Sequence, residues 1–184
     1  MKRRAVLALG GLVWAAAGAG VPAPPPEVQR VWPEVRLQGQ ARMTFLGLRV
    51  YDARLWVPSQ ADAQRYEDAP LALALHYLRR LDGAAIAERS ITEMRRVGAF
   101  SEAQASAWLE AMKRAFPDVG DGDRLVGLHL PGRGARFYFN GQRTAEIDDP
   151  EFARLFFGIW LSPRTSEPRL REQLLGRSGR EGAP

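Results

Sequence analysis

The sequence predicts an α+β fold in which an antiparallel sheet is covered on one face by helices. Segments with strand patterns are grouped at residues 35–57, 71–79 and 124–147, and segments with helical patterns lie between and after these groups. Such grouping differs from the strict alternation of strand and helix that builds a parallel sheet. The pair Asn140-Gly141, placed between alternating apolar residues, adds a strong signal for an antiparallel hairpin.

The first three strands are predicted at the start of this pattern. Residues 35–57 are rich in aliphatic, aromatic and β-branched side chains and are interrupted at Gly47, which indicates two consecutive strands. Residues 71–79 place leucines and a tyrosine at alternate positions, as expected when one face of a strand is buried.

Two helices are predicted next. Residues 84–97 repeat apolar side chains at helical spacing, and Arg89 and Glu93 fall largely on the polar side of this helix. Residues 101–116 form a second amphipathic segment, which opens with a capping-box pattern at Ser101.

The second half of the chain continues with strands and then helices. Residues 124–130 alternate as a strand, and residues 135–147 form the hairpin around Asn140-Gly141. The segment 149–160 predicts a helix that is apolar on nearly all sides, and the segment 167–175 predicts a short final helix. The aromatic and aliphatic side chains of the first of these helices are expected either to fill the core or to wall a ligand cavity: Phe152, Phe156, Phe157, Ile159 and Trp160.

Arg42 is the unusual residue of the first strand pair. Because alternate side chains of a strand point to opposite faces, Arg42 shares a face with Thr44 and Leu46, while Met43 and Phe45 take the other face. Both faces are partly apolar, so two interpretations stay open. Arg42 is either a solvated strand arginine or an arginine that faces the apolar side and needs an anionic or carbonyl partner.

The two ends of the chain predict an exported protein with one domain. Residues 1–19 combine three basic residues, thirteen apolar residues and small residues at a cleavage-site spacing, which is typical of a signal peptide. Residues 20–34 are proline-rich and predict a linker or N-terminal arm, and residues 177–184 predict a disordered tail. The domain then covers residues 35–176, and a periplasmic or secreted location is expected.

Composition narrows the classes of partner. The formal charge is +5, but removal of the signal peptide leaves 23 basic against 21 acidic residues, or +2. No basic face with interleaved aromatic residues is evident, so a nucleic-acid partner is not expected. No second stretch is long enough to cross a membrane, and the absence of cysteine excludes disulfides and a cysteine-linked lipid anchor.

The common catalytic and metal-binding patterns are absent from the sequence. There is no cysteine nucleophile, no GxSxG elbow and no phosphate-binding loop. His76 and His129 are the only histidines, and no third ligand accompanies them at metal spacing. No cofactor and no metal are therefore predicted.

Several segments together resemble the bacterial chalcone-isomerase-like family. They occur in the family's order and cover about residues 35–176: GQARMTFLGLRVYDARLWV, RRVGAF with its successor SEAQASAW, FYFNGQ, and FARLFFGIWLSPRTSEPRLREQLLG. The resemblance implies an open-faced β-sandwich, in which a large antiparallel sheet carries a layer of helices on one face.

The resemblance also implies a role for Arg42. In plant isomerases of this fold an arginine on an early strand holds the reacting oxygen, and in fatty-acid-binding members the same arginine grips a carboxylate; Arg42 matches it by position. Tyr51 is the accompanying ligand-binding candidate, and Tyr51 or Tyr77 would assist proton transfer in an enzyme. The family's tyrosine, asparagine and hydroxyl positions fall at Asp82, Arg89 and near Leu155, which do not match.

Three functions follow from these observations. The first is a non-catalytic binder of a small acidic amphiphile such as a fatty acid, with an apolar carboxylate or carbonyl compound as its partner. The second is an isomerase or intramolecular lyase that acts on an enone-type substrate. The third is a structural or partner-binding envelope protein, in which Arg42 forms an internal salt bridge.

Overall fold

The computed structural model describes residues 22–177, and its centre is a six-stranded antiparallel sheet. The strands pair in chain order, so that each neighbours the next: β1 Val35–Phe45, β2 Leu48–Pro58, β3 Leu71–Tyr77, β4 Arg124–Leu130, β5 Gly134–Phe139 and β6 Gln142–Ile147. Every pair is antiparallel. The predicted α+β class with an antiparallel sheet is therefore confirmed.

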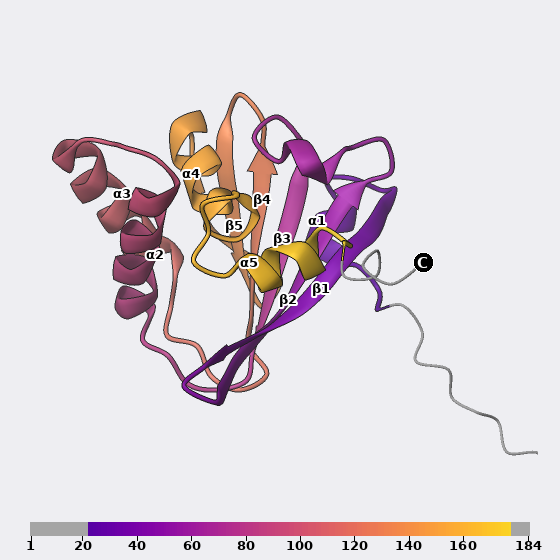
Figure 1. The fold of residues 1–184 in the computed structure, drawn as a ribbon, viewed down its shortest axis with the longest axis horizontal. Coiled ribbons are helices and arrows are strands. Elements are labelled where there is room, and N and C mark those ends of the chain that lie inside the picture. The colour runs from indigo at the N-terminus through magenta and orange to yellow at the C-terminus, as the bar shows by residue number, and fades with distance from the viewer. Residues whose placement is uncertain (1–21, 178–184) are drawn as a thin grey trace, which may run out of the picture.

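Helices occupy the two long connections and the chain ends: α1 Pro26–Gln29, α2 Gly83–Val97, α3 Glu102–Ala115, α4 Pro150–Leu161 and α5 Pro168–Leu174, with a short 3₁₀ turn at Ala63–Arg65. Local chemistry explains where the long helices begin. Asp82, Ser101 and Asp149 each accept a backbone N–H of the first turn of α2, α3 and α4, respectively. In Figure 1, α2 and α3 stand together at one side of the molecule, and α5 crosses in front of the first strands.

The main core lies between the sheet and the layer formed by α2 to α5. It is built around stacked and edge-to-face aromatic rings, among them Phe116, Phe137, Phe152 and Phe156. The most deeply buried large side chains include Phe152 and Phe157 of α4, whose almost wholly apolar surface predicted this burial. Helix α4 therefore anchors the helical layer to β4 and β5.

The opposite face of the sheet carries a smaller apolar cluster that the N-terminal segment covers. Val28 of α1 is fully buried and packs in the same cluster as Trp56 of β2. Glu27 is also buried, and its Oε1 accepts from Nη2 of Arg124 at 2.8 Å. The part of the predicted linker or arm that the structure describes thus contains a helix and packs on the sheet, because Val28 finds an apolar surface there.

Other predictions for the chain ends lie outside the described residues, namely the signal peptide at residues 1–19 and nearly all of the tail at residues 177–184. Within residues 22–177, no helix combines the length and the apolar character needed to cross a membrane.

His76 belongs to the polar part of the sheet face that lies opposite the helical layer. Its Nε2 lies 3.4 Å from Nη1 of Arg54, and Arg124 is close by across the β3–β4 pairing. Burial first, and then the positive charges of Arg54 and Arg124, lower the pKa of His76 to about 4. The imidazole is therefore neutral in the folded protein at physiological pH.

Gly39 allows α5 to approach β1 closely. It lies at a register irregularity of the β1–β2 ladder. A Cβ atom at this position would overlap the backbone carbonyl oxygens of Gln173 and Leu174 at the end of α5. The contact between α5 and β1 therefore depends on the absence of a side chain at this position.

We expect Gly39→Ala to lower the free energy of unfolding by about 1–3 kcal/mol, because the obstructing atoms are backbone and cannot rotate away. Gly120→Ala is the matched control, since its Cβ would make an ordinary contact at 3.6 Å with Asp123, and it should change stability by less than about 0.5 kcal/mol. Urea denaturation followed by circular dichroism measures both. Equal stability of the two variants would contradict the close packing of α5.

We also expect the protein to lose stability as the pH falls through the range between the unfolded-state and folded-state pKa values of His76. The folded-state pKa of about 4 lies below the ordinary value of 6.5, so the unfolded chain binds this proton first as the pH falls. Stability should therefore decline from about pH 6.5 towards pH 4, to which buried His129 contributes in the same direction. His76→Gln should flatten this decline in pH-dependent urea titrations, and an unchanged slope would argue against the lowered pKa.

Candidate functional site

The pairing between β1 and β2 decides which side chains of the first hairpin meet the helical layer. Met43 lies opposite Tyr51, and Arg42 lies opposite Asp52. Because strand side chains alternate, each pair occupies one face of the sheet. Met43 and Tyr51 face the helices, where they line a cavity, and Arg42 and Asp52 take the other face.

Arg42 forms a two-pronged ion pair with Asp52 on that other face. Its Nε donates to Oδ1 at 2.6 Å and its Nη2 donates to Oδ2 at 2.8 Å. This arrangement raises the pKa of Arg42, and the hydrogen bond from Arg42 lowers the pKa of Asp52. Both side chains are partly open to solvent, with 48% and 30% of their areas exposed. Of the two interpretations left open by the sequence, the structure thus shows a solvated strand arginine with a carboxylate partner.

An apolar cavity of about 340 Å³ lies between the sheet and the helical layer. Its floor comes from β1 to β5 and its roof from α2, α4 and the segment that follows α4. Most of its lining is aliphatic or aromatic, and representative residues are Met43, Leu73, Leu75, Ile86, Phe116, Phe137, Phe156 and Ile159. This volume and lining are within the range of small-molecule pockets, which is about 300–1,000 Å³.

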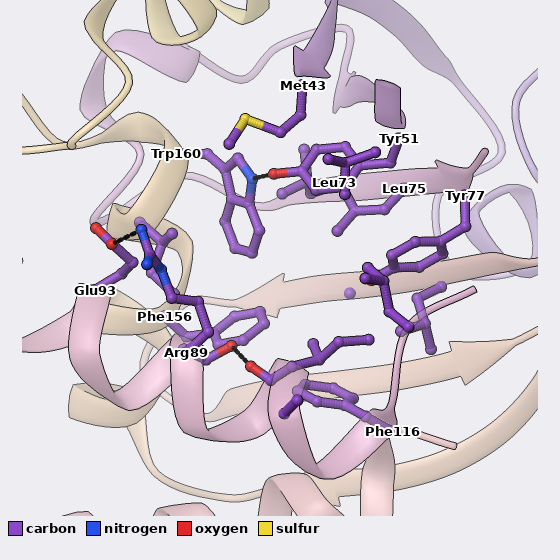
Figure 2. Close-up of a pocket in the computed structure, with 18 of the residues that line it drawn as sticks. Met43, Tyr51, Leu73, Leu75, Tyr77, Arg89, Glu93, Phe116, Phe156 and Trp160 are labelled. Carbon is purple, nitrogen blue, oxygen red and sulfur yellow. Dashed lines mark hydrogen bonds and ion pairs between the residues drawn. The ribbon is translucent and has the colours of Figure 1, made fainter. Parts of the chain in front are cut away.

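Tyr51 provides the best-placed hydrogen-bonding group in this cavity. Its hydroxyl oxygen accepts from Nε1 of Trp160 at 3.0 Å, as Figure 2 shows. Because the indole nitrogen can only donate, the hydroxyl hydrogen of Tyr51 takes no part in this contact and can be donated to another acceptor. Burial raises the pKa of Tyr51 to about 12, so the group is a neutral donor over the physiological range.

Tyr77 lies beside Tyr51 on the neighbouring strand, and the two rings meet edge to face with centroids 5.9 Å apart. Burial raises the pKa of Tyr77 even more strongly, so its hydroxyl also stays protonated. Neither tyrosine is therefore suited to accept a proton near neutral pH as a general base.

Charged groups of α2 border the cavity near Tyr51. Glu93 is 6% exposed, and its Oε1 lies 2.7 Å from Nη2 of Arg89. Arg96 approaches the second oxygen of Glu93 at 3.4 Å. The contact with Arg89 lacks hydrogen-bond geometry, and no other group in the described part of the chain donates to Glu93 Oε1. Arg89 itself is 63% exposed at the rim.

The prediction that Glu93 lies on the polar, solvent-facing side of α2 is wrong, because Glu93 is buried. The same prediction missed that Arg89 lines the cavity. The spacing held a signal for both, because Glu93 follows Ile86 by seven residues and Arg89 follows it by three, so all three lie along one helical stripe. Polarity alone assigned them to solvent.

The aromatic residues of α4 satisfy both interpretations that the sequence allowed. Phe152 packs inside the core, while Phe156, Phe157, Ile159 and Trp160 also line the cavity. The cavity is thus the part of the aromatic core that these rings leave unfilled.

The two histidines lie apart from this cavity. His76 is on the opposite face of the sheet beside Arg54, and Nδ1 of buried His129 donates to the carbonyl of Ala69 at 3.0 Å. Within residues 22–177, no three His, Asp or Glu side chains gather in a group that would hold a metal ion.

The structure does not bring the predicted site residues together. Tyr51 lines the apolar cavity, whereas Arg42 lines a more open and more polar hollow on the other face with Asp52 and Arg54. A one-residue step along β1 separates Arg42 from the cavity-facing Met43. The arrangement can enclose an apolar chain and donate a hydrogen bond to an oxygen from Tyr51, with Arg89 as the nearby cation.

Comparisons with known proteins agree with this architecture. The sequence model of a family described as chalcone isomerase-like matches residues 17–176. An uncharacterised protein of Haemophilus influenzae is 30% identical over 140 residues, which is 76% of this chain and 67% of that protein. The crystal structure of a fatty-acid binding protein of Arabidopsis thaliana superposes with a TM-score of 0.60 at 12% identity, over 77% of this chain and 87% of that one.

We expect Arg42→Ala to cost little stability, because the Arg42–Asp52 pair is half open to water, where ion pairs contribute weakly. Its loss of unfolding free energy should be smaller than that of Gly39→Ala in the same urea titration. An internal salt bridge, as the structural-protein hypothesis assumes, predicts instead a loss of several kcal/mol, of the size seen when a buried pair is broken. A loss of that size would show that the pair is structural.

Proposed function

The chain belongs to the chalcone isomerase-like family, and we propose that it binds a small acidic amphiphile, such as a fatty acid, without altering it chemically. The observation that carries this proposal is the apolar cavity between the sheet and the helices, with the Tyr51 hydroxyl at one side. The Arabidopsis protein that shares the fold is named as a fatty-acid binding protein, which supports the same class of ligand.

The apolar tail of the ligand would lie between the sheet and α4. Side chains such as Leu73, Leu75 and Phe156 line this space without any polar atom to satisfy, so an aliphatic chain loses contact with water at no hydrogen-bonding cost. Transfer of each methylene from water to such a site is favourable by about 0.8 kcal/mol, so chain length should control affinity.

The head group would lie near Tyr51 and Arg89. The hydroxyl of Tyr51 donates to one ligand oxygen, because its own oxygen already accepts from Trp160. Arg89 supplies positive charge at the rim. Its poorly aligned contact with Glu93 leaves guanidinium hydrogens for a carboxylate, while Arg96 stays beside Glu93. We therefore place the anionic contact at Arg89 rather than at Arg42, which is already paired with Asp52.

Binding without turnover agrees with the chemistry of the cavity. An isomerase would need a group that exchanges a proton near neutral pH, and the pKa values of Tyr51 and Tyr77 are raised far above that range. The arginine expected to stabilise an oxyanion lies on the opposite face of the sheet. We also propose an exported location for the protein, which the N-terminal sequence predicts.

The proposal is tested by isothermal titration of delipidated protein with a long-chain fatty acid and with the alcohol of equal length. Tyr51→Phe should weaken binding about fivefold, as expected for one lost neutral hydrogen bond of about 1 kcal/mol. Arg89→Gln should weaken binding of the acid by about tenfold or more and leave the alcohol nearly unchanged, since a charge-assisted contact is lost only with the acid.

Arg42→Gln is the matched control, because it removes the same charge from the other face and should keep wild-type affinity. Loss of binding in Arg42→Gln with full binding in Arg89→Gln would show that Arg42, and not Arg89, binds the ligand carboxylate. Failure of the delipidated protein to bind any acid in a chain-length series would refute the proposal, and turnover of an enone substrate by wild-type protein would replace it with the enzyme hypothesis.

A further inference from the structure

The tip of the β1–β2 hairpin exposes a group of large apolar side chains. Phe45, Leu46 and Leu48 are 56%, 85% and 53% exposed, and they are the large hydrophobic residues with high exposure in the described part of the chain. In Figure 1 this hairpin ends at the lower edge of the molecule, on the side where α2 begins. Their gathering at one projecting point is unusual for a water-facing surface.

The backbone conformation of this turn disfavours the leucine at position 46. Leu46 and Gly47 have φ values of 49° and 76°, so the hairpin closes through two left-handed residues. Leucine is disfavoured in this conformation because its Cβ crowds the following carbonyl. Its side chain is almost fully exposed and therefore gives the fold little packing in return.

The β5–β6 hairpin of the same sheet has a turn of the same backbone conformation, but its residues suit that conformation. Asn140 and Gly141 join β5 to β6 with nearly the same φ values, 48° and 85°. Asparagine tolerates this conformation, and the Asn140 side chain accepts from the backbone N–H of Arg124 and donates to Asp123. The side chain of Asn140 thus stabilises neighbouring loops through hydrogen bonds, whereas the side chain of Leu46 adds only exposed apolar surface.

Arginines surround the apolar tip. Arg49 follows it on β2, and the hydrogen bond from the N–H of Leu78 to the carbonyl of Val50 brings exposed Arg79 and Arg80 alongside. Within residues 22–177, these three arginines have no salt-bridge partner.

The carboxylates of the neighbouring loops keep their negative charge, but those that form hydrogen bonds bind backbone N–H groups and do not form ion pairs with these three arginines. Asp82, Asp118 and Asp123 accept from the N–H groups of Ala85, Gly83 and Gly120, respectively, and Asp121 stays exposed.

We propose that this tip docks on the surface of an anionic lipid bilayer. Phe45, Leu46 and Leu48 enter the boundary between head groups and acyl chains, and Arg49, Arg79 and Arg80 contact the anionic head groups. Apolar insertion and electrostatic attraction add together in such interfacial binding, and the arginine charge favours a bilayer over a neutral apolar surface. Phe45 and Arg79 also line the cavity, so docking places its mouth at the membrane.

Docking by itself does not depend on ligand binding, but passage of an amphiphile between bilayer and cavity rests on the proposed function. The two are therefore tested separately. Flotation with vesicles of phosphatidylcholine and phosphatidylglycerol measures docking, and titration with a fatty acid in solution measures binding.

Leu46→Asn is the decisive variant, because it copies the Asn-Gly turn of the β5–β6 hairpin and is expected to keep or raise the melting temperature. It should reduce the vesicle-bound fraction at least fivefold and leave the affinity for the fatty acid in solution unchanged. The double variant Arg49→Gln/Arg80→Gln should lose binding to the anionic vesicles, whereas Arg30→Gln/Arg169→Gln, with the same change of charge elsewhere on the surface, should retain it. Wild-type protein should bind pure phosphatidylcholine weakly, and added salt should weaken binding to anionic vesicles.

Full vesicle binding by Leu46→Asn, or no binding by wild-type protein, would overturn the docking proposal whatever the outcome of the ligand titration. A wild-type dimer in sedimentation that Leu46→Asn dissolves would overturn it as well, since the tip would then be a contact between copies of this chain. Docking with no affinity for any amphiphile would instead refute only the proposed function.

Discussion

The antiparallel register between β1 and β2 is the constraint on which the rest of the site depends. It sets Met43 opposite Tyr51 and Arg42 opposite Asp52, and the alternation of strand side chains then sends the two pairs to opposite faces. A slip of one residue would exchange them and place a guanidinium group against the aromatic rings of α4. The ion pair between Arg42 and Asp52 joins the two strands on the solvent side, where it contributes only weakly to stability, and the hydrogen bond between Tyr51 and Trp160 joins β2 to α4 on the inner side.

The helical layer turns this register into a cavity. Helix α4 packs aromatic rings against β4 and β5, and the absence of a side chain at Gly39 allows α5 to approach β1 closely. The space left between α2, β3 and Trp160 is apolar, yet α2 brings buried Glu93 and exposed Arg89 to its border. Because a buried carboxylate needs a compensating charge, Arg89 and Arg96 belong to the same electrostatic unit as Glu93.

The β1–β2 and β5–β6 hairpins illustrate how structure and function make different demands on the same backbone shape. Both close through a left-handed residue followed by glycine. Asn140 uses its side chain to hold neighbouring loops, whereas Leu46 presents an apolar side chain to water beside the cavity mouth. In the isolated protein, no packing contact offsets the free-energy cost of the left-handed conformation of Leu46 or of its exposure to water. Burial of Leu46 in a partner surface would offset these two free-energy costs.

Local pattern was enough to predict much of this protein. Periodicity and short-range hydrogen bonding, which act within a few residues, account for the grouping of strands and helices, the cap at Ser101, the Asn140-Gly141 hairpin and the separation of Arg42 from Met43. The resemblance to a family implied the same layer of helices on one face of the sheet. Only the tertiary structure decided which face of the first hairpin is inner. Both faces carry apolar residues, so the choice rests on what α4 and α5 cover. The same holds for the cavity, which is the volume that packing leaves unfilled. Glu93 lies on the same helical stripe as Ile86, but its burial depends on how α2 packs against the rest of the fold.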